Sequence, residues 1–297
     1  MEPAAQDHIY QTAYNRGYDE GYDKGFDRGR YAGGDGVVDQ LMPNGFVLPL
    51  VPVEDIIAAG LERFRDRMWP VMGTAEVTAF LTDALDSGRP ASVIRLGDGE
   101  LLAMAQESVY SIEYIRKHAP FLTYAGVELP DPAARDALVT AVRNADIVGI
   151  PLLRVPHFQH LAFQLFDFYG IDWKAKRITH STINYAMYLE HALSALIKGR
   201  KLLTVGNHAE GLAAFLKDRG YHVAGAVAPV MGMRDVPRVM ESVAAHDFDL
   251  AIVSAGIAAV VLVWRIAAEL GKAAFDFGHL ADSMISGEAP LVPAGTA

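Results

Sequence analysis

The sequence contains no cysteine among its 297 residues. A chain without thiols cannot form disulfides, thiolate zinc sites or a cysteine nucleophile, although histidine and carboxylate groups can still bind metals. Positive charge is also scarce, because 26 Lys and Arg residues stand against 36 Asp and Glu residues, and the formal net charge is −10. Nucleic-acid binding needs clustered basic residues that neutralise phosphates, so this composition disfavours a general nucleic-acid-binding protein.

Long apolar runs are absent as well. The longest, residues 257–264, ends at Arg265 and is far shorter than the roughly 20 residues of a membrane-spanning helix. The first four residues lack the basic segment and apolar segment of a secretion signal, so we expect a soluble, cytoplasmic protein. Hydrophobic residues still make up 51% of the chain, which is enough for a self-sufficient core.

The first 36 residues contain a four-residue repeat. From Tyr14 the sequence reads YNRG-YDEG-YDKG-FDRG-RYAG, with glycine at every fourth position from 17 to 33. A period of four is close to the 3.6 residues of a helical turn, so the repeat predicts a helix with an aromatic row and a glycine row. Each interior glycine destabilises a helix by about 1 kcal/mol relative to alanine. Two interpretations remain open: an arm that forms a homo-oligomer or docks on a partner, and a frayed leader.

The rest of the chain divides into three parts. Residues 37–53 contain three prolines and an Asn-Gly pair and predict a connector, 54–287 predict one domain, and 288–297 predict a loose tail. Within 54–287, helical patterns at 54–68, 75–85, 131–144, 158–169, 185–197, 210–219 and 257–270 alternate with apolar or β-branched runs. The strands are expected at 91–96, 147–150, 177–183, 201–205, 222–228, 250–253 and 273–277. Such alternation predicts an α/β, Rossmann-like, mostly parallel sheet with helices on both faces, whose ligands bind at the carboxyl ends of the strands.

The loop after the first expected strand carries the strongest chemical signal. On an extended backbone Asp98 and Glu100 would point to the same side, and their oxygens would suit Mg²⁺ or Mn²⁺. Gly97 would let a bulky anion approach, and the planar fork of Arg95 suits a phosphate. An ordinary Gly-Asp-Gly turn with a solvated Glu and a structural Arg explains the same residues equally well.

Two further turns join a strand to a helix through small residues. Gly206 and Asn207 precede one helix, and Ser254 and Gly256 precede another. The helix N–H groups exposed at such turns can bind phosphate, although strand–Gly–helix joints are common in proteins of every function.

The last expected strand ends with Asp276, and His279 follows it. These two side chains could contact a ribose, bind a metal or act as a general base, and a structural Asp with a capping His is an equal alternative. The sequence contains no P-loop, no G-x-S-x-G elbow and no H-E-x-x-H motif, so the familiar NTPase, hydrolase and zincin signatures are missing.

Five ordered blocks resemble the GT-D-fold glycosyltransferases, a family once known only as a domain of unknown function. They are SVIRLGDGE at 92–100, YAGVELPD at 124–131, ADIVGIP at 145–151, FDLAIVSAG at 248–256 and GKAAFDFGHLAD at 271–282. The resemblance extends over residues 75–285, and Asp98-Gly99-Glu100 matches the family's Asp-x-Glu signature. The Gly-Tyr-Asp repeat is also similar to repeats in some bacterial members.

This resemblance implies a transferase that uses Mn²⁺ or Mg²⁺ and a nucleotide-sugar donor, a UDP-sugar above all. It implies that Glu100 binds the metal, that Asp98 holds the metal or the donor directly or through water, and that Arg95 lies beside the diphosphate. His279 would close the pocket and, like Asp276 or another carboxylate, could deprotonate the acceptor hydroxyl. The remaining strand-end residues would border the nucleotide: Gly97, Gly206, Asn207, Ser254, Gly256 and Asp276.

Two other functions fit the same residues. The Asp98–Glu100 loop could serve a metal-dependent phosphohydrolase of nucleotides or phosphosugars. Alternatively, the Rossmann-like domain could be a non-catalytic binding platform and the repeat its oligomerisation arm. The sequence leaves open which sugar, base and acceptor would be used and whether transfer inverts the anomeric carbon. The acceptor, a glycan, peptide or small molecule, is expected near residues 111–123 and 152–160.

Overall fold

The computed structural model describes residues 3–293 and the side chains from residue 17 onward. The chain forms two compact units, Met1–Pro70 and Val71–Ala297. The boundary therefore lies later than the connector expected at 37–53. The predicted helix at 54–68 corresponds to α3 (Val53–Arg63) and the 3₁₀ turn η1 (Arg65–Arg67), and both belong to the first unit.

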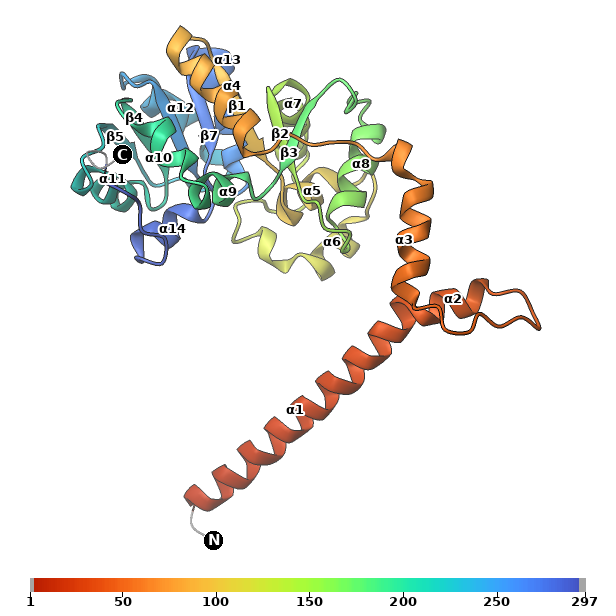
Figure 1. Ribbon diagram of the computed structural model, residues 1–297. Coiled ribbons are helices and arrows are strands. Elements are labelled where there is room, and N and C mark those ends of the chain that lie inside the picture. Colours follow the sequence, from red (N-terminus) through yellow and green to blue (C-terminus); the bar gives the residue numbers. More distant parts are fainter. Residues whose placement is uncertain (1–2, 294–297) are drawn as a thin grey trace. The chain divides into compact units, whose positions relative to one another are not determined.

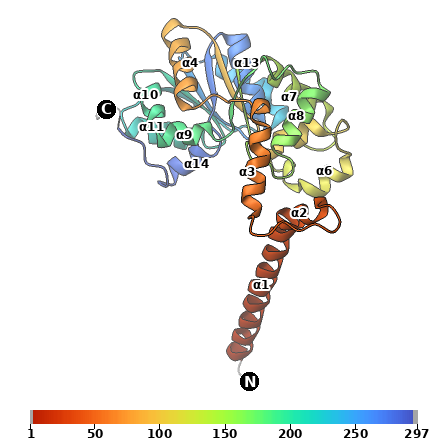
Figure 2. The ribbon, with the colours of Figure 1, turned by 45° about the vertical axis from the view of Figure 1, so that its right-hand side comes forward.

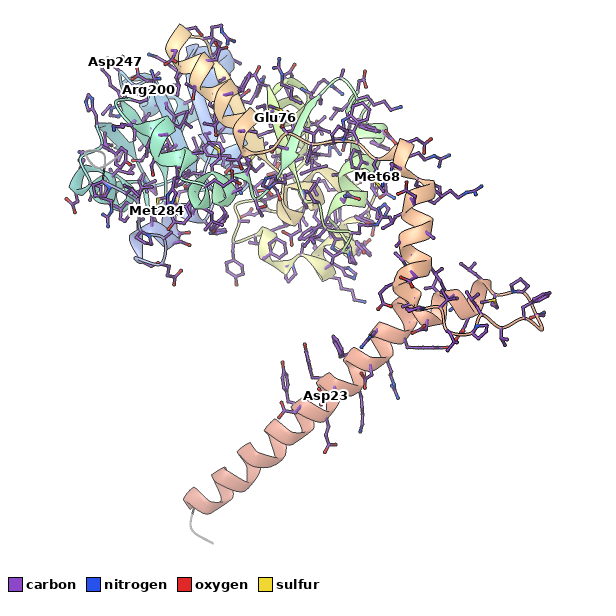
Figure 3. The ribbon with its side chains drawn as sticks, in the orientation of Figure 1. Asp23, Met68, Glu76, Arg200, Asp247 and Met284 are labelled. Atoms are coloured by element: carbon purple, nitrogen blue, oxygen red, sulfur yellow. The ribbon has the colours of Figure 1, made fainter. Side chains whose placement is uncertain are left out.

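The first unit begins with α1 (Pro3–Gly33), a helix of 31 residues that covers the whole repeat. The helix predicted from the period of four is confirmed. The side chains of Tyr18, Tyr22 and Phe26 are each more than half exposed, while the side chain of Tyr14 lies outside the described residues. Figure 3 shows Asp23 projecting from the same helix. The start of the expected connector is helical too, as α2 (Asp35–Leu41).

The second unit is built on a seven-stranded sheet in which every pair of neighbouring strands is parallel (Figure 1). The order across the sheet is β3-β2-β1-β7-β6-β4-β5. All seven strands lie where the sequence predicted them, and the predicted α/β fold is confirmed. Their bounds are β1 (Ala91–Arg95), β2 (Ile147–Ile150), β3 (Arg177–His180), β4 (Leu202–Gly206), β5 (Val223–Val227), β6 (Leu250–Ser254) and β7 (Ala273–Asp276).

Helices cover both faces of the sheet, as the buried strand patterns require. Ile94 and Val253 belong to the apolar cluster of one face, and Val93 and Phe275 belong to the cluster of the other. Figure 2 shows the two groups of helices on opposite sides of the sheet. The first face packs against α5 (Asp98–Ala105), α6 (Ile112–His118), α7 (Pro132–Asn144), α8 (Gln159–Phe168), α12 (Val236–Ala244) and α13 (Ala258–Leu270). The second packs against α4 (Thr74–Ser87), α9 (Ile183–Leu189), α10 (Ala192–Ile197), α11 (Ala209–Asp218) and α14 (Leu280–Ile285).

Four short helices of the second unit, α5, α6, α12 and α14, were not predicted. The most consequential is α5, because it begins at Asp98 and makes the Asp-Gly-Glu motif the first turn of a helix rather than an extended segment. The helix expected at 185–197 is also divided into α9 and α10, at a bend where His191 has a φ of 59°.

The chain after α14 differs from the expected loose tail. Ala289 and Leu291 are buried against the second apolar cluster. The Tyr188 hydroxyl donates to the carbonyl of Pro290 (3.0 Å), and the Tyr221 hydroxyl donates to that of Val292 (2.7 Å). Packing therefore fixes this segment up to residue 293, and residues 294–297 lie outside the described residues. Within the described chain, no helix is both long enough and apolar enough to cross a bilayer.

Candidate active site

The sequence-predicted residues meet at the carboxyl edge of the sheet, around the ends of β1, β7, β6 and β4, which are consecutive neighbours. The chain leaves β1 into α5 on one face and leaves β7 into α14 on the other face. Two adjacent strands whose connections diverge in this way leave a crevice at their carboxyl ends, and ligands of open parallel sheets bind in such crevices.

The Asp-Gly-Glu turn caps its own helix. The Glu100 carboxylate folds back to accept a hydrogen bond from the Gly97 N–H (2.7 Å), and Asp98 accepts one from the Gly99 N–H (2.9 Å). Side chains two residues apart on a helix do not face each other. The expectation that Asp98 and Glu100 point to the same side of an extended backbone is therefore wrong. No described residue donates a hydrogen bond to Asp98 Oδ2.

Arg95 is held inside the domain by Asp276. Its Nη2 lies 3.0 Å from Asp276 Oδ1, and the two side chains are only 15% and 6% exposed. Its Nε donates to the Asp276 carbonyl (2.8 Å), and its Nη1 donates to the carbonyl of Ser181 (2.7 Å) and to Asn184 Oδ1 (3.2 Å). Four of the five guanidinium N–H groups are thus paired with other described residues. The place of Arg95 beside a diphosphate stays a prediction.

The Asp276 carboxylate in this ion pair is buried, with its side chain only 6% exposed. Burial raises the pKa of the Asp276 carboxyl, and the Arg95 guanidinium opposes this rise. Gly278, with a φ of 53°, leaves room for the guanidinium, because a Cβ on this residue would clash with Arg95 Nη2. Asp276 therefore positions the end of β1, and its role as a general base or ribose ligand stays a prediction.

Glu100 lies near the Arg95–Asp276 ion pair. Burial raises the pKa of its carboxyl, the nearby Asp276 raises it further, and the Gly97 amide and Arg95 lower it. The carboxyl groups of Glu100 and Asp276 and the guanidinium of Arg95 thus act on one another electrostatically at the carboxyl end of β1. The described residues contain no cluster of three or more His, Asp or Glu side chains suited to a metal. Mg²⁺ commonly binds through one or two carboxylates together with substrate phosphates, so Glu100 or Asp98 fits that mode even though the two side chains do not face each other.

The two glycine turns begin α11 and α13 beside this crevice. Gly206 has a φ of 146°, and a Cβ on it would clash with the Ser254 carbonyl, so only glycine lets β4 and β6 end side by side. Gly256 is exposed, and Ser254 Oγ is buried with no hydrogen-bond partner among the described residues. The turns therefore present helix N-termini, as the sequence predicted, together with one unsatisfied hydroxyl.

Asn207 has a structural contact. Its Oδ1 accepts a hydrogen bond from the Val230 N–H (2.8 Å), which holds the loop after β5 beside the β4 turn. The same loop is held at its other end by Asp235, which accepts hydrogen bonds from the Met231 N–H (3.0 Å) and from Arg238 Nε (2.7 Å). The hydrogen bonds from Arg238 and Met231 lower the pKa of Asp235 to about 2.

Replacing Asp235 with asparagine should destabilise the protein at pH 7, and the difference from wild type should shrink as the pH falls toward 2. The folded-state pKa lies below the ordinary value of 3.8, so the carboxylate stabilises the fold above that value and loses its effect as the pH falls through about 2. Urea unfolding at pH 7, 4 and 2.5 measures the difference in the free energy of unfolding between the wild type and Asp235→Asn. A gap of constant size over this range would contradict the role of the charged carboxylate.

His279 lies at the rim, with its side chain 92% exposed. Its Nδ1 is 3.1 Å from Asp282 Oδ2, and the other oxygen of Asp282 is 2.5 Å from His208 Nδ1. Burial raises the pKa of Asp282, but the hydrogen bonds from the two imidazoles outweigh it and lower the pKa. The sequence singled out His279 and not its partner, because Asp282 stands three residues later in a helix that was not predicted.

A second group missed by the sequence lies on the other side of the crevice. It is an aromatic cluster made of Tyr110, Tyr114, His118 and His157. Tyr114 is stacked between Tyr110 and His118 at centroid distances of 4.4 and 4.0 Å, and its hydroxyl lies 2.9 Å from His157 Nε2. Tyr114, His118 and His157 fall in the two regions expected to bind an acceptor, and Tyr110 directly precedes the first of them, but nothing in their spacing indicates that they meet.

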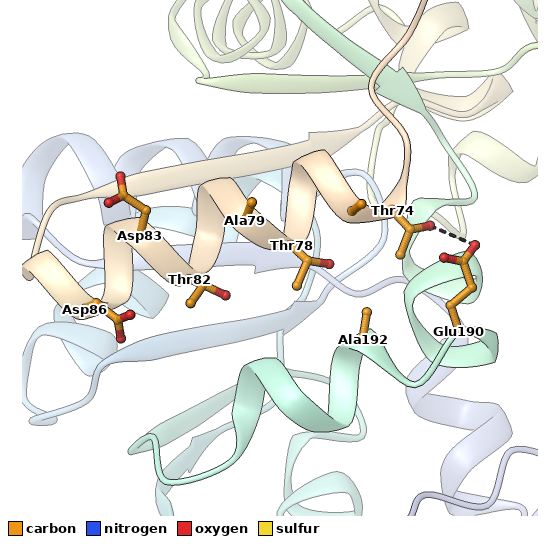
Figure 4. Close-up of a pocket in the computed structure, with 9 residues that line it drawn as sticks. Thr74, Thr78, Ala79, Thr82, Asp83, Asp86, Glu190 and Ala192 are labelled. Carbon is orange, nitrogen blue, oxygen red and sulfur yellow. Dashed lines mark hydrogen bonds between the residues drawn. The ribbon is translucent and has the colours of Figure 1, made fainter.

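A separate groove of about 620 Å³ lies between α4 and the start of α10 (Figure 4). Thr74 donates to Glu190 at one end of it (3.1 Å). None of the sequence-predicted site residues lines this groove, so it does not coincide with the strand-end crevice.

Comparison with known proteins agrees with this architecture. The model of the GT-D fold-like domain matches residues 72–284. A structure of a glycosyltransferase containing domain of unknown function 1792, from Streptococcus sanguinis, has 19% sequence identity and a TM-score of 0.50. The match covers 74% of this chain and 86% of the Streptococcus sanguinis chain. A selenomethionine-substituted structure of the same domain has 18% identity and a TM-score of 0.51, covering 74% and 82%. A third, described as having a distinct glycosyltransferase fold, has 18% identity and a TM-score of 0.50, covering 79% and 86%. No curated protein matches the sequence.

Proposed function

This chain belongs to the family of GT-D fold-like domains and has a glycosyltransferase fold, and we propose that it transfers a sugar from a nucleotide-diphosphate donor to an acceptor hydroxyl. The observation that carries the proposal is the first turn of α5, which places the carboxylates of Asp98 and Glu100 at the carboxyl end of β1, beside the Arg95–Asp276 ion pair. Carboxylate oxygens are ligands that Mg²⁺ and Mn²⁺ prefer, and a donor diphosphate is bound together with such a cation.

Glu100 and Asp98 are the residues that would hold Mn²⁺ or Mg²⁺, Asp98 directly or through water. The bound cation would neutralise charge on the leaving diphosphate. Arg95 keeps Asp276 and the end of β1 in place, and so acts on the donor only through the shape and charge of the crevice.

The donor phosphates are proposed to lie against the turns of β4 and β6. The N-termini of α11 and α13 begin there, and the positive end of each helix dipole favours an anion. The unsatisfied Ser254 hydroxyl is a further donor at this position. Groups that are fixed before the reaction stabilise the negative charge of the departing nucleotide diphosphate more than they stabilise the ground state. The family resemblance favours a UDP-sugar.

His279 is the proposed general base if the reaction inverts the anomeric carbon. Its Nδ1 hydrogen bond to Asp282 orients the ring and leaves Nε2 for an acceptor proton, and an imidazole is suited to this role near neutral pH. We place the chemistry wholly in the second unit of a cytoplasmic enzyme. For the exposed aromatic row of α1 we propose contact with a second copy of the chain.

Incubation of the full-length protein with a panel of nucleotide sugars tests the function. With Mn²⁺ present, we expect one donor to be consumed with release of its nucleoside diphosphate, and we expect EDTA to abolish the reaction. Release of inorganic phosphate from free nucleotides or phosphosugars would support the phosphohydrolase alternative instead. Absence of both donor binding and turnover, with metal supplied, would contradict the transferase and leave the binding-protein alternative.

A further inference from the structure

One residue of the aromatic cluster, His157, has a left-handed backbone conformation. His157 lies in the loop between β2 and α8 and has a φ of 66°. A left-handed conformation is uncommon for a residue other than glycine and persists where the surrounding contacts enforce it. Here the contacts are the Tyr114 hydroxyl at 2.9 Å and edge-on packing against three rings at centroid distances of 5.8 Å.

The contact with Tyr114 uses one of the two ring nitrogens of His157, and the other can still form a hydrogen bond. Nε2 is the nitrogen that meets Tyr114, and no described residue forms a hydrogen bond with Nδ1. Burial lowers the pKa of His157, His118 lowers it further, and Asp98 raises it. The lowered pKa favours the neutral form of the ring, and the Asp98 carboxylate at the start of α5 acts on it electrostatically.

The order of strands separates this group from the proposed donor side. β2 lies beside β1 on the side away from β7, whereas the glycine turns of β6 and β4 lie beyond β7. Phe121, in the 3₁₀ turn η2 (Pro120–Leu122) after α6, packs near Gly99 of the motif. A donor held at the α11 and α13 termini would leave the β2 side of Asp98 for the second substrate.

We propose that His157 binds the acceptor through Nδ1, by a hydrogen bond to a sugar hydroxyl, and that Tyr114 is a positioning residue that holds the imidazole toward it. The proposal rests on the proposed transferase function and names the half of the crevice in which its acceptor lies. A neutral imidazole with one nitrogen already paired offers a single, directed hydrogen bond to a hydroxyl.

Two variants test the proposal with little risk to the fold. His157→Asn keeps a side chain that tolerates the left-handed backbone, and Tyr114→Phe keeps the stacked ring while removing the hydroxyl. His160→Asn is the matched control, because it changes an exposed histidine that hydrogen-bonds only to Arg154 among the described residues. The probes are the nucleotide sugar that the wild type consumes and a panel of p-nitrophenyl glycosides as acceptors.

We expect His157→Asn to raise the acceptor KM about 10-fold, as for the loss of one buried hydrogen bond. Tyr114→Phe should raise it in the same direction, while the donor KM, the hydrolysis of donor without acceptor and the Tm stay unchanged in both variants. Equal changes in donor and acceptor KM, or a fall in Tm with both, would show a structural role and overturn the proposal. Wild-type protein that hydrolyses donor yet transfers to no glycoside would also overturn it. Wild-type protein that neither binds nor hydrolyses any donor would instead overturn the transferase function itself.

Discussion

Replacing Arg95 with leucine is expected to lower the free energy of unfolding by about 3–5 kcal/mol, the usual loss when one partner of a buried ion pair is removed. The substitution leaves the Asp276 carboxylate, 6% exposed, without its guanidinium. It also removes the donors that satisfy the Ser181 carbonyl and Asn184. Since a domain is stable by about 5–15 kcal/mol in total, urea unfolding should show a large fall in the midpoint.

The matched control for this substitution is Arg89→Leu. Arg89 forms a salt bridge with Asp83 in which the two side chains are 51% and 72% exposed, and such surface pairs contribute less than about 1 kcal/mol. Adding Asp276→Asn to Arg95→Leu should restore part of the lost stability, because the amide carries no charge and still accepts the hydrogen bond from the Gly278 N–H. Equal shifts for Arg95→Leu and Arg89→Leu would contradict the buried ion pair as a source of stability.

Replacing Glu100 with glutamine is expected to weaken metal-dependent donor binding at least about 100-fold, since changes to groups that only support metal ligands already weaken metal binding by 10- to 100-fold. The amide oxygen can still accept the Gly97 hydrogen bond, so the start of α5 should remain intact. Glu100→Ala should lose the same binding and in addition about 1 kcal/mol of stability, because it removes the cap. Calorimetric titration of the donor with and without Mn²⁺, together with thermal unfolding, separates the two effects.

Glu76 supplies a control of the same geometry outside the site. At the start of α4 its Oε2 accepts a hydrogen bond from the Gly73 N–H (2.8 Å), which matches the Glu100 cap. Figure 3 labels Glu76 at this place. Glu76→Gln should leave donor binding unchanged. Metal-dependent binding that survives in Glu100→Gln would refute the assignment of Glu100 as a ligand, and equal losses in the two variants would point to the caps rather than to the metal.

The strands and the long helices could be predicted because their signals are local. A run such as residues 250–253 is apolar throughout since β6 is buried on both faces, and the pattern needs no knowledge of its neighbours. Helices α5, α6 and α14 have eight residues or fewer, so they contain too few turns to show a period. The missing prediction of α5 led directly to the wrong orientation of Asp98 and Glu100.

The sequence by itself determined the α/β class, the seven strand positions, the helical repeat and the set of strand-end turns in which the candidate site lies. Only the tertiary structure decided which contacts those residues make. It paired Arg95 with Asp276, 181 positions away, and placed His157 beside Tyr114, 43 positions away. Hydrophobic periodicity shows which face of a segment is buried. It can be read from the sequence because hydrophobicity is a property of each side chain by itself. Ion pairs, desolvation and clashes depend on partners that only the parallel sheet brings together, so no local pattern could indicate that Arg95 is paired with Asp276 or that His157 contacts Tyr114.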